Sequence, residues 1–167
     1  MKKALSKLTL LISLLLVSCG TPANESIQPS GMPSIDFPTN NLNQKLVVSA
    51  PVGWNNVNED GTFGLMINNN SDQDISFKSD FGAKIFYFHN GDWIETQNKI
   101  VYSDEDVIVM PNKENEAQKI GSTFMGVNLE DIPTPTTIRV FVFGTIYTDG
   151  GSTSEDVGAY TDLIISP

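Results

Sequence analysis

The chain has 167 residues, and its 20 acidic side chains outnumber its 10 basic ones, which gives a formal net charge of −10 at pH 7. A chain this acidic repels nucleic acid, and its lysines and arginines are too sparse to line a nucleic-acid groove, so nucleic-acid binding is set aside. The single cysteine excludes an intramolecular disulfide, so the fold must depend on its apolar core.

The first 18 residues have the pattern of an export signal. Lys2, Lys3 and Lys7 form a basic start, and residues 8–17 form an almost uninterrupted apolar run. As a helix this run would be about 15 Å long, about half the thickness of a bilayer's hydrocarbon core, so it is too short to span one stably. We therefore expect residues 1–18 to be a cleaved signal peptide and not a transmembrane helix.

The apolar run ends in Leu16-Val17-Ser18-Cys19, which resembles the bacterial lipobox. In lipoproteins of that family a diacylglyceryl group is attached to the cysteine thiol, and a dedicated signal peptidase cuts the chain just before this residue. The resemblance implies cleavage between Ser18 and Cys19, and a lipidated Cys19 as the membrane anchor. Its amine is often acylated as well, and two or three acyl chains hold a protein stably where one holds it only marginally. The alternative is a plain signal peptide with an incidental cysteine.

Such an anchor would hold the mature chain at the cell envelope, on the outer face of the plasma membrane or on an outer membrane. Cleavage removes three lysines and no acidic residue, so the net charge falls from −10 to −13. We interpret this acidity as a source of solubility at the cell surface, with calcium binding as the alternative.

Residues 19–44 have the composition of a flexible tether. Proline recurs at four positions among Asn, Ser, Thr and Gly, and bulky apolar residues are few. Such a segment buries too little apolar surface to order itself. A flexible chain of this length has a typical reach of about 25 to 30 Å, so we expect a disordered spacer that lifts a domain off the membrane.

Residues 45–167 have the length of one domain and show strand periodicity without a long helical stripe. The sequence Asn90-Gly91 between two strand patterns predicts a two-residue hairpin turn, because both central positions of a type I′ turn need positive φ. Residues 138–146 are apolar on both faces, which is typical of a central strand covered on both sides. The predicted strands are 45–49, 62–68, 74–78, 84–89, 92–97, 107–110, 137–148 and 157–165.

A series of about seven or eight short strands without intervening helices predicts an all-β fold, an antiparallel β-sandwich. The domain resembles the immunoglobulin-like modules of bacterial envelope proteins in its strand-turn-strand segment 65–77 and in the later Trp93. The resemblance implies an immunoglobulin-like sandwich. We expect it to be monomeric and to need no cofactor, metal or disulfide.

The sequence holds no recognisable catalytic set. His89 is the only histidine, and no G-x-S-x-G or S-x-x-K motif supplies an activated nucleophile. Phosphate-binding and dinucleotide-binding glycine motifs are also missing from the sequence. A pair of carboxylates, as in a glycosidase, remains an alternative because 20 acidic residues make chance pairs inevitable.

A weak calcium pattern lies in the loop 68–74. Asn70, Asp72 and Asp74 have the spacing of the first three ligands of an EF-hand loop, but the later positions that need glycine and glutamate are Ile75 and Phe81. Asn, Ser and Asp are also the residues that turns prefer. We therefore favour a turn and assign no metal.

The remaining candidates for function are contact residues on loops. Trp54, with Asn55 and Asn56, lies in a polar loop without a strand partner, and Phe124 and Met125 lie in the long connection 111–135, for which a short strand is the alternative. Exposed aromatic residues are common anchors of protein and sugar recognition, and the alternative for Trp54 is a side chain folded back to cap the sandwich. We therefore expect a non-catalytic binding or assembly module for a protein or glycan partner, with a carboxylate-pair hydrolase or a calcium-binding domain as alternatives. The other strand aromatics are expected to fill the core: Phe86, Phe88, Trp93, Phe141 and Phe143.

Overall fold

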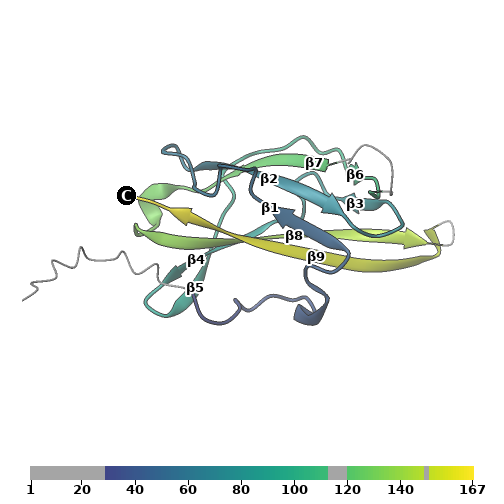
Figure 1. The fold of residues 1–167 in the computed structure, drawn as a ribbon, viewed down its shortest axis with the longest axis horizontal. Coiled ribbons are helices and arrows are strands. Elements are labelled where there is room, and N and C mark those ends of the chain that lie inside the picture. The colour runs from purple at the N-terminus through teal and green to yellow at the C-terminus, as the bar shows by residue number, and fades with distance from the viewer. Residues whose placement is uncertain (1–28, 113–119, 149–150) are drawn as a thin grey trace, which may run out of the picture.

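The computed structural model describes residues 29–112, 120–148 and 151–167. The predicted signal peptide, its cleavage position at Ser18 and the predicted lipidation site Cys19 lie outside the described residues. The fold is all-β (Figure 1), and the described residues also form two short 3-10 helices, η1 (Thr39–Asn41) and η2 (Leu129–Asp131). The strands are β1 (Leu46–Ser49), β2 (Thr62–Asn69), β3 (Ile75–Phe77), β4 (Lys84–His89), β5 (Asp92–Thr96), β6 (Val107–Val109), β7 (Ile120–Gly126), β8 (Thr136–Thr148) and β9 (Thr153–Ile165).

Two antiparallel sheets form a sandwich, as the sequence predicts. The smaller sheet has the order β1-β2-β7, and the six-stranded sheet has the order β5-β4-β8-β3-β6, with β9 paired to β8. β3 and β4 lie in line along the same side of β8, while β9 follows its other side. The described residues form nine strands, one more than the predicted list.

The additional strand is β7, which lies in the long connection 111–135. Its core-facing positions are Gly121, Thr123 and Met125, opposite Ile67, Leu65 and Phe63 of β2. Because two of these three inward residues are not large apolar side chains, the strand lacks the alternation by which the others can be recognised.

The hairpin between β4 and β5 confirms the clearest local prediction. Asn90 has φ of 53° and Gly91 has φ of 94°, the positive values that a type I′ turn needs at both positions. The cross-strand pairs run from Ile85 opposite Thr96 to His89 next to the turn.

The main core lies between the two sheets. Alternate residues of β2, β8 and β9 point into it, and its members are almost completely shielded from solvent. At Gly144 of β8 an added Cβ would lie 2.6 Å from Ile75 and 2.8 Å from the Phe77 ring, so a side chain there would collide with the core. The largest fully buried side chains facing this core are Phe63, Phe77, Leu46, Leu65, Ile67, Ile75, Ile85, Met125, Ile138, Leu163 and Ile165.

β8 is buried on both faces, which confirms the prediction of a doubly covered central strand. Val140 and Val142 point into the main core and are fully buried. Phe141, between them, points to the opposite face and is also fully buried. The covering layer on that face comes from the N-terminal part of the chain.

Residues 31–43, here called the N-terminal strap, form this third layer. In Figure 1 the strap runs along the outer face of the six-stranded sheet, on the side opposite the three-stranded sheet. Ile35, Phe37 and Leu42 of the strap pack against a second apolar cluster that includes Phe86 and Phe141. The outer face of this sheet therefore carries its own small core.

The packing of the strap differs from two expectations drawn from the sequence. The predicted tether 19–44 does not extend to its predicted end, because Leu42 is buried and the Asn43 N–H donates to the Gly158 carbonyl of β9 at 3.0 Å. Three of its apolar side chains, Ile35, Phe37 and Leu42, pack in the outer cluster, so low overall hydropathy did not prevent docking. The aromatic residues expected in one core also divide differently: Phe86 and Phe141 are buried in the outer cluster, while Phe88, Trp93 and Phe143 are partly exposed.

Candidate functional site

A closely packed polar cluster surrounds Arg139 on the outer face of β8. Its Nε and Nη2 atoms each donate to one oxygen of Asp162 at 2.7 Å, and its Nη1 donates to the Gly31 carbonyl at 3.0 Å. The guanidinium lies over the rings of Trp93 and Tyr160, 4.6 Å from each centroid. Only 7% of Arg139 is exposed, so the cation is both shielded and paired.

This cluster supports the fold and is closed to a ligand. The guanidinium's partners are the strap, the neighbouring strand and two rings, and together they fasten the strap at Gly31. Arg139 stands out in the sequence as the one charged residue of segment 138–146. Nothing in the sequence indicates Asp162 or Gly31 as its partners, because the pairing depends on the register of β8 and β9.

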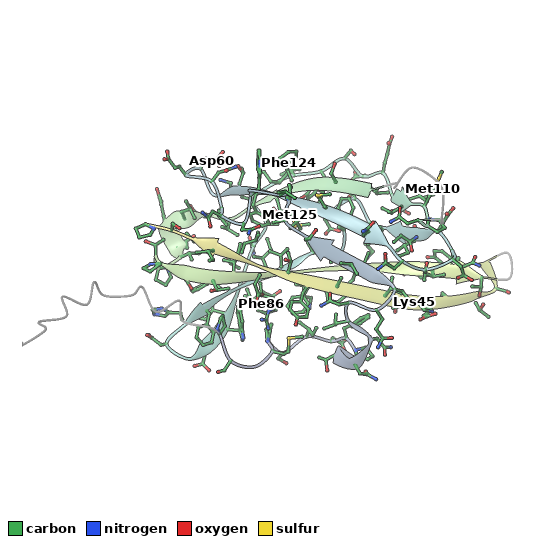
Figure 2. The ribbon with its side chains drawn as sticks, viewed as in Figure 1. Lys45, Asp60, Phe86, Met110, Phe124 and Met125 are labelled. Atoms are coloured by element: carbon green, nitrogen blue, oxygen red, sulfur yellow. The ribbon has the colours of Figure 1, made fainter. Side chains whose placement is uncertain are left out.

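Trp54 and Phe124 are both exposed, and the turn that carries Trp54 begins near Phe124. Trp54 is 48% exposed and Phe124 is 60% exposed, and the turn that carries Trp54 begins at Pro51. A Cβ placed on Gly64 of β2 would lie 3.5 Å from Pro51 and 3.7 Å from Phe124, so Pro51 and the Phe124 ring both lie next to Gly64 on the outer face of the three-stranded sheet. Figure 2 shows Phe124 projecting outwards from the three-stranded sheet. Together with Val52, which is 99% exposed, these residues are here called the apolar patch.

The other predicted contact residues divide between this surface and the core. Asn55 and Asn56 are exposed, and the Asn55 carbonyl accepts a hydrogen bond from the Ile164 N–H at 3.1 Å, which fixes the loop against β9. Met125 is fully buried between the sheets, so the expectation that it contacts a partner is wrong. Figure 2 shows the two neighbours, Phe124 and Met125, on opposite faces of β7, as strand alternation requires.

The loop of the calcium candidates is organised by a residue that the sequence analysis did not single out. Asn69 is fully buried; its Nδ2 donates to the carbonyls of Gln73 and Val109, and its Oδ1 accepts from the Ser71 N–H. A run of asparagines gives no signal for which one is buried. Asn70, Asp72 and Asp74 are exposed, and among the described residues no three His, Cys, Asp or Glu side chains gather where they could hold a metal ion.

One shallow groove, of about 430 Å³, lies on the outer face of the six-stranded sheet beside the strap. Asp36, Asp106 and Asp156 line it, and all three are exposed. A catalytic acid at neutral pH needs a raised pKa, which burial or a close like charge would give. These exposed carboxyls lack the enclosure that such a role needs.

The pKa of Asp60 is lowered, which is opposite to the shift that a catalytic acid needs. Hydrogen bonds from the Thr62 hydroxyl and the Thr62 N–H, at 2.6 and 2.9 Å, hold the pKa of the Asp60 carboxyl below its usual value, and the nearby Lys99 lowers it further. The carboxylate stays ionised and caps the start of β2. It is therefore unsuited to donate a proton near neutral pH.

Comparison with known proteins gives no relative. No family model matches the chain, and no curated protein or solved structure is significantly similar to it. Among the described residues, no helix has the length and apolar character needed to cross a bilayer.

Proposed function

We propose that this protein is a lipid-anchored binding module of the bacterial cell envelope, which recognises a protein or glycan through its apolar patch and catalyses no reaction. One observation carries the proposal: Phe124 and the turn that carries Trp54, which lie far apart in the sequence, come together beside Gly64, and both aromatic side chains are exposed. The acidic side chains of the chain account for its solubility. The exposed aromatic side chains contribute nothing to solubility.

The chemistry of the apolar patch supports recognition. Large side chains that are already held in place lose little conformational freedom when a partner covers them, and tryptophan is enriched among residues that dominate binding energy. The Trp54 N–H donates to the Pro51 carbonyl at 2.9 Å and Phe124 is paired with Gly64 of β2, so the backbone that carries each of these side chains is held in place. Asn55 and Asn56 add polar groups at the rim, as expected around an apolar contact.

A carboxylate-pair hydrolase and a calcium-binding domain are the alternatives that the sequence leaves open. The acids of the groove are exposed, and the Asp60 pKa is lowered. Neither feature favours hydrolysis. Glycan hydrolysis that disappears when one carboxylate pair is changed would overturn the proposed class, and a loss of folding on adding a chelator would favour calcium.

The lipobox at positions 16–19 supports the anchor. The strap is fastened at Gly31 by Arg139, so the linker between a lipidated Cys19 and the sandwich is residues 20–30. At about 3.5 Å per residue this linker spans at most about 40 Å, which keeps the domain close to the membrane surface. A partner at this position is a component of the envelope or reaches the cell from outside.

Changing Cys19→Ala should abolish the incorporation of labelled fatty acid, because the thiol that accepts diacylglyceryl is gone. Unprocessed precursor should accumulate, and it should be visible as a slower band on a denaturing gel. The matched control is Ser18→Ala, which keeps a small residue before the cysteine and should still be labelled. Labelling of the Cys19→Ala protein would show that the anchor is elsewhere.

Replacing Trp54 or Phe124 by alanine should each weaken partner binding by about 2 kcal/mol or more while the fold survives. Both side chains are largely exposed, so their removal leaves the main core intact. Affinity of the purified variants for the envelope partner measures the first effect, and thermal unfolding measures the second. Ile108→Ala is the control, because Ile108 is 63% exposed on the other sheet. A change confined to the melting temperature would assign Trp54 to packing and would end its role as a contact.

A further inference from the structure

We propose that the groove on the outer face of the six-stranded sheet is a binding site for a neutral saccharide. This site is separate from the apolar patch, which lies on the other sheet. The groove has a volume of about 430 Å³, within the range of roughly 300 to 1,000 Å³ that is usual for small-molecule sites.

The groove originates from a break in the sheet. β3 ends at Phe77 and β4 begins at Lys84, and the connecting residues leave the strand conformation through positive φ values at Phe81 and Gly82. The Phe143 N–H of β8 still donates to the Phe81 carbonyl at 2.9 Å, so the break is held in a defined shape. The strap closes one side of it with Asp36 and Phe37.

The floor of the groove is small and polar, while two of its margins are aromatic. Ser76 of β3 lies opposite Thr145 of β8, and Thr145 Oγ1 donates to Asp156 at 3.0 Å. The rings of Phe37 and Phe143 meet at a centroid distance of 5.0 Å, and Tyr147 also lines the groove and is 56% exposed. This composition suits a sugar ring, which has an apolar face of C–H groups and a rim of hydroxyls.

Charge favours an uncharged ligand over an ion. The groove is lined by Lys78 and Lys84 together with the three aspartates, so either sign of ligand charge meets some repulsion. The chain as a whole carries a net charge of −10, which disfavours anions further. Lysine ammonium groups and aspartate carboxylates can instead donate to and accept from sugar hydroxyls.

A peptide is a poorer fit, because β3 and β8, the strands under the groove, are already paired on both sides. Ser76 is paired with Ile108 of β6 on one side and with Thr145 on the other. β8 is paired with β9 along its whole length. Addition of an extended peptide as a further strand therefore has no backbone groups to use here, and recognition must come from side chains.

The test is calorimetric titration of the full chain, in a detergent without a sugar headgroup, with maltotriose, cellotriose and N,N′-diacetylchitobiose. At least one of them should bind saturably in the millimolar range or tighter. Trigalacturonic acid, an anionic trisaccharide, should bind more weakly than the best neutral probe. The absence of binding by all three neutral probes, or a tighter fit of the anionic one, would overturn the proposal.

Two variants locate the site. Tyr147→Ala removes an exposed ring, and Thr145→Val removes a hydroxyl at constant shape; each should weaken saccharide binding about tenfold or more. Phe124→Ala should bind the saccharide as the unchanged protein does, although it loses the macromolecular partner of the apolar patch. If saccharide binding were unchanged in both groove variants, the site would lie elsewhere and the assignment would be refuted, whatever the outcome for the apolar patch.

Discussion

Replacing Phe141 by alanine should lower the free energy of unfolding by about 3 to 5 kcal/mol. The Phe141 ring is fully buried, although it points away from the main core. It meets Phe86 edge-on at 5.8 Å between centroids and Tyr160 at 5.4 Å, and the strap covers this cluster. Removing the ring would leave a cavity between two layers that cannot close without moving the strap or the sheet.

Urea unfolding, followed by far-UV circular dichroism, measures this loss. Phe124→Ala is the matched control: it is also a strand phenylalanine, but it is 60% exposed, so it should cost about 1 kcal/mol or less. Equal costs for the two substitutions would mean that the outer cluster contributes no more than a surface ring and that the strap is not a structural layer.

Replacing Asp162 by alanine should destabilise the protein by about 3 kcal/mol, the lower end of the range for a broken buried ion pair. Asp162 accepts both hydrogen bonds of a bidentate contact from Arg139. The arginine side chain is only 8% exposed, so its charge would lose its counter-ion where water replaces it poorly. The carboxylate is 37% exposed, which keeps the expected cost below the upper end of the range.

Urea unfolding of three variants tests whether the loss of Asp162 costs more stability than the loss of Arg139. Arg139→Met should cost less than Asp162→Ala, because it leaves behind a carboxylate that water can reach and keeps an apolar stem between the rings. Asp72→Ala, at an exposed loop position, should change stability by about 0.5 kcal/mol or less. If Arg139→Met proved the more costly, stacking on Trp93 and Tyr160 would outweigh charge pairing.

Short sequence patterns predict those elements of the fold whose conformation depends on neighbouring residues alone. Asn90-Gly91 predicts the hairpin because few residues tolerate positive φ at two successive positions. The double-faced apolar run of β8 predicts a covered strand, but it does not reveal what covers the second face. The second face is covered by Ile35, Phe37 and Leu42, which are scattered through a proline-rich segment. Their role becomes evident only from their packing against the aromatic rings of the sheet.

The candidate sites likewise depend partly on single residues that the sequence reveals and partly on contacts between residues that are far apart in the sequence. Trp54 and Phe124 can be selected individually as loop or connection aromatics, but their shared surface depends on Gly64 opposite Phe124 in a pairing of β2 with β7. The expectation for Met125 is wrong because it treats the connection 111–135 as a surface loop with a strand only as the alternative, whereas strand alternation in β7 sends Met125 inward. The groove could not be predicted, since it combines the strap, the break after β3 and a lysine-aspartate rim.

Site-specific photo-crosslinking on intact cells tests the proposed function most directly. A photoreactive residue at Val52, the most exposed member of the apolar patch, should form a discrete adduct with one envelope or extracellular component. The same residue at Glu95, which is exposed on the outer face of the six-stranded sheet, should not form that adduct. The Val52 adduct should disappear when Phe124→Ala is added. An adduct that forms equally from Glu95, or one that is indifferent to Phe124, would contradict recognition through the apolar patch.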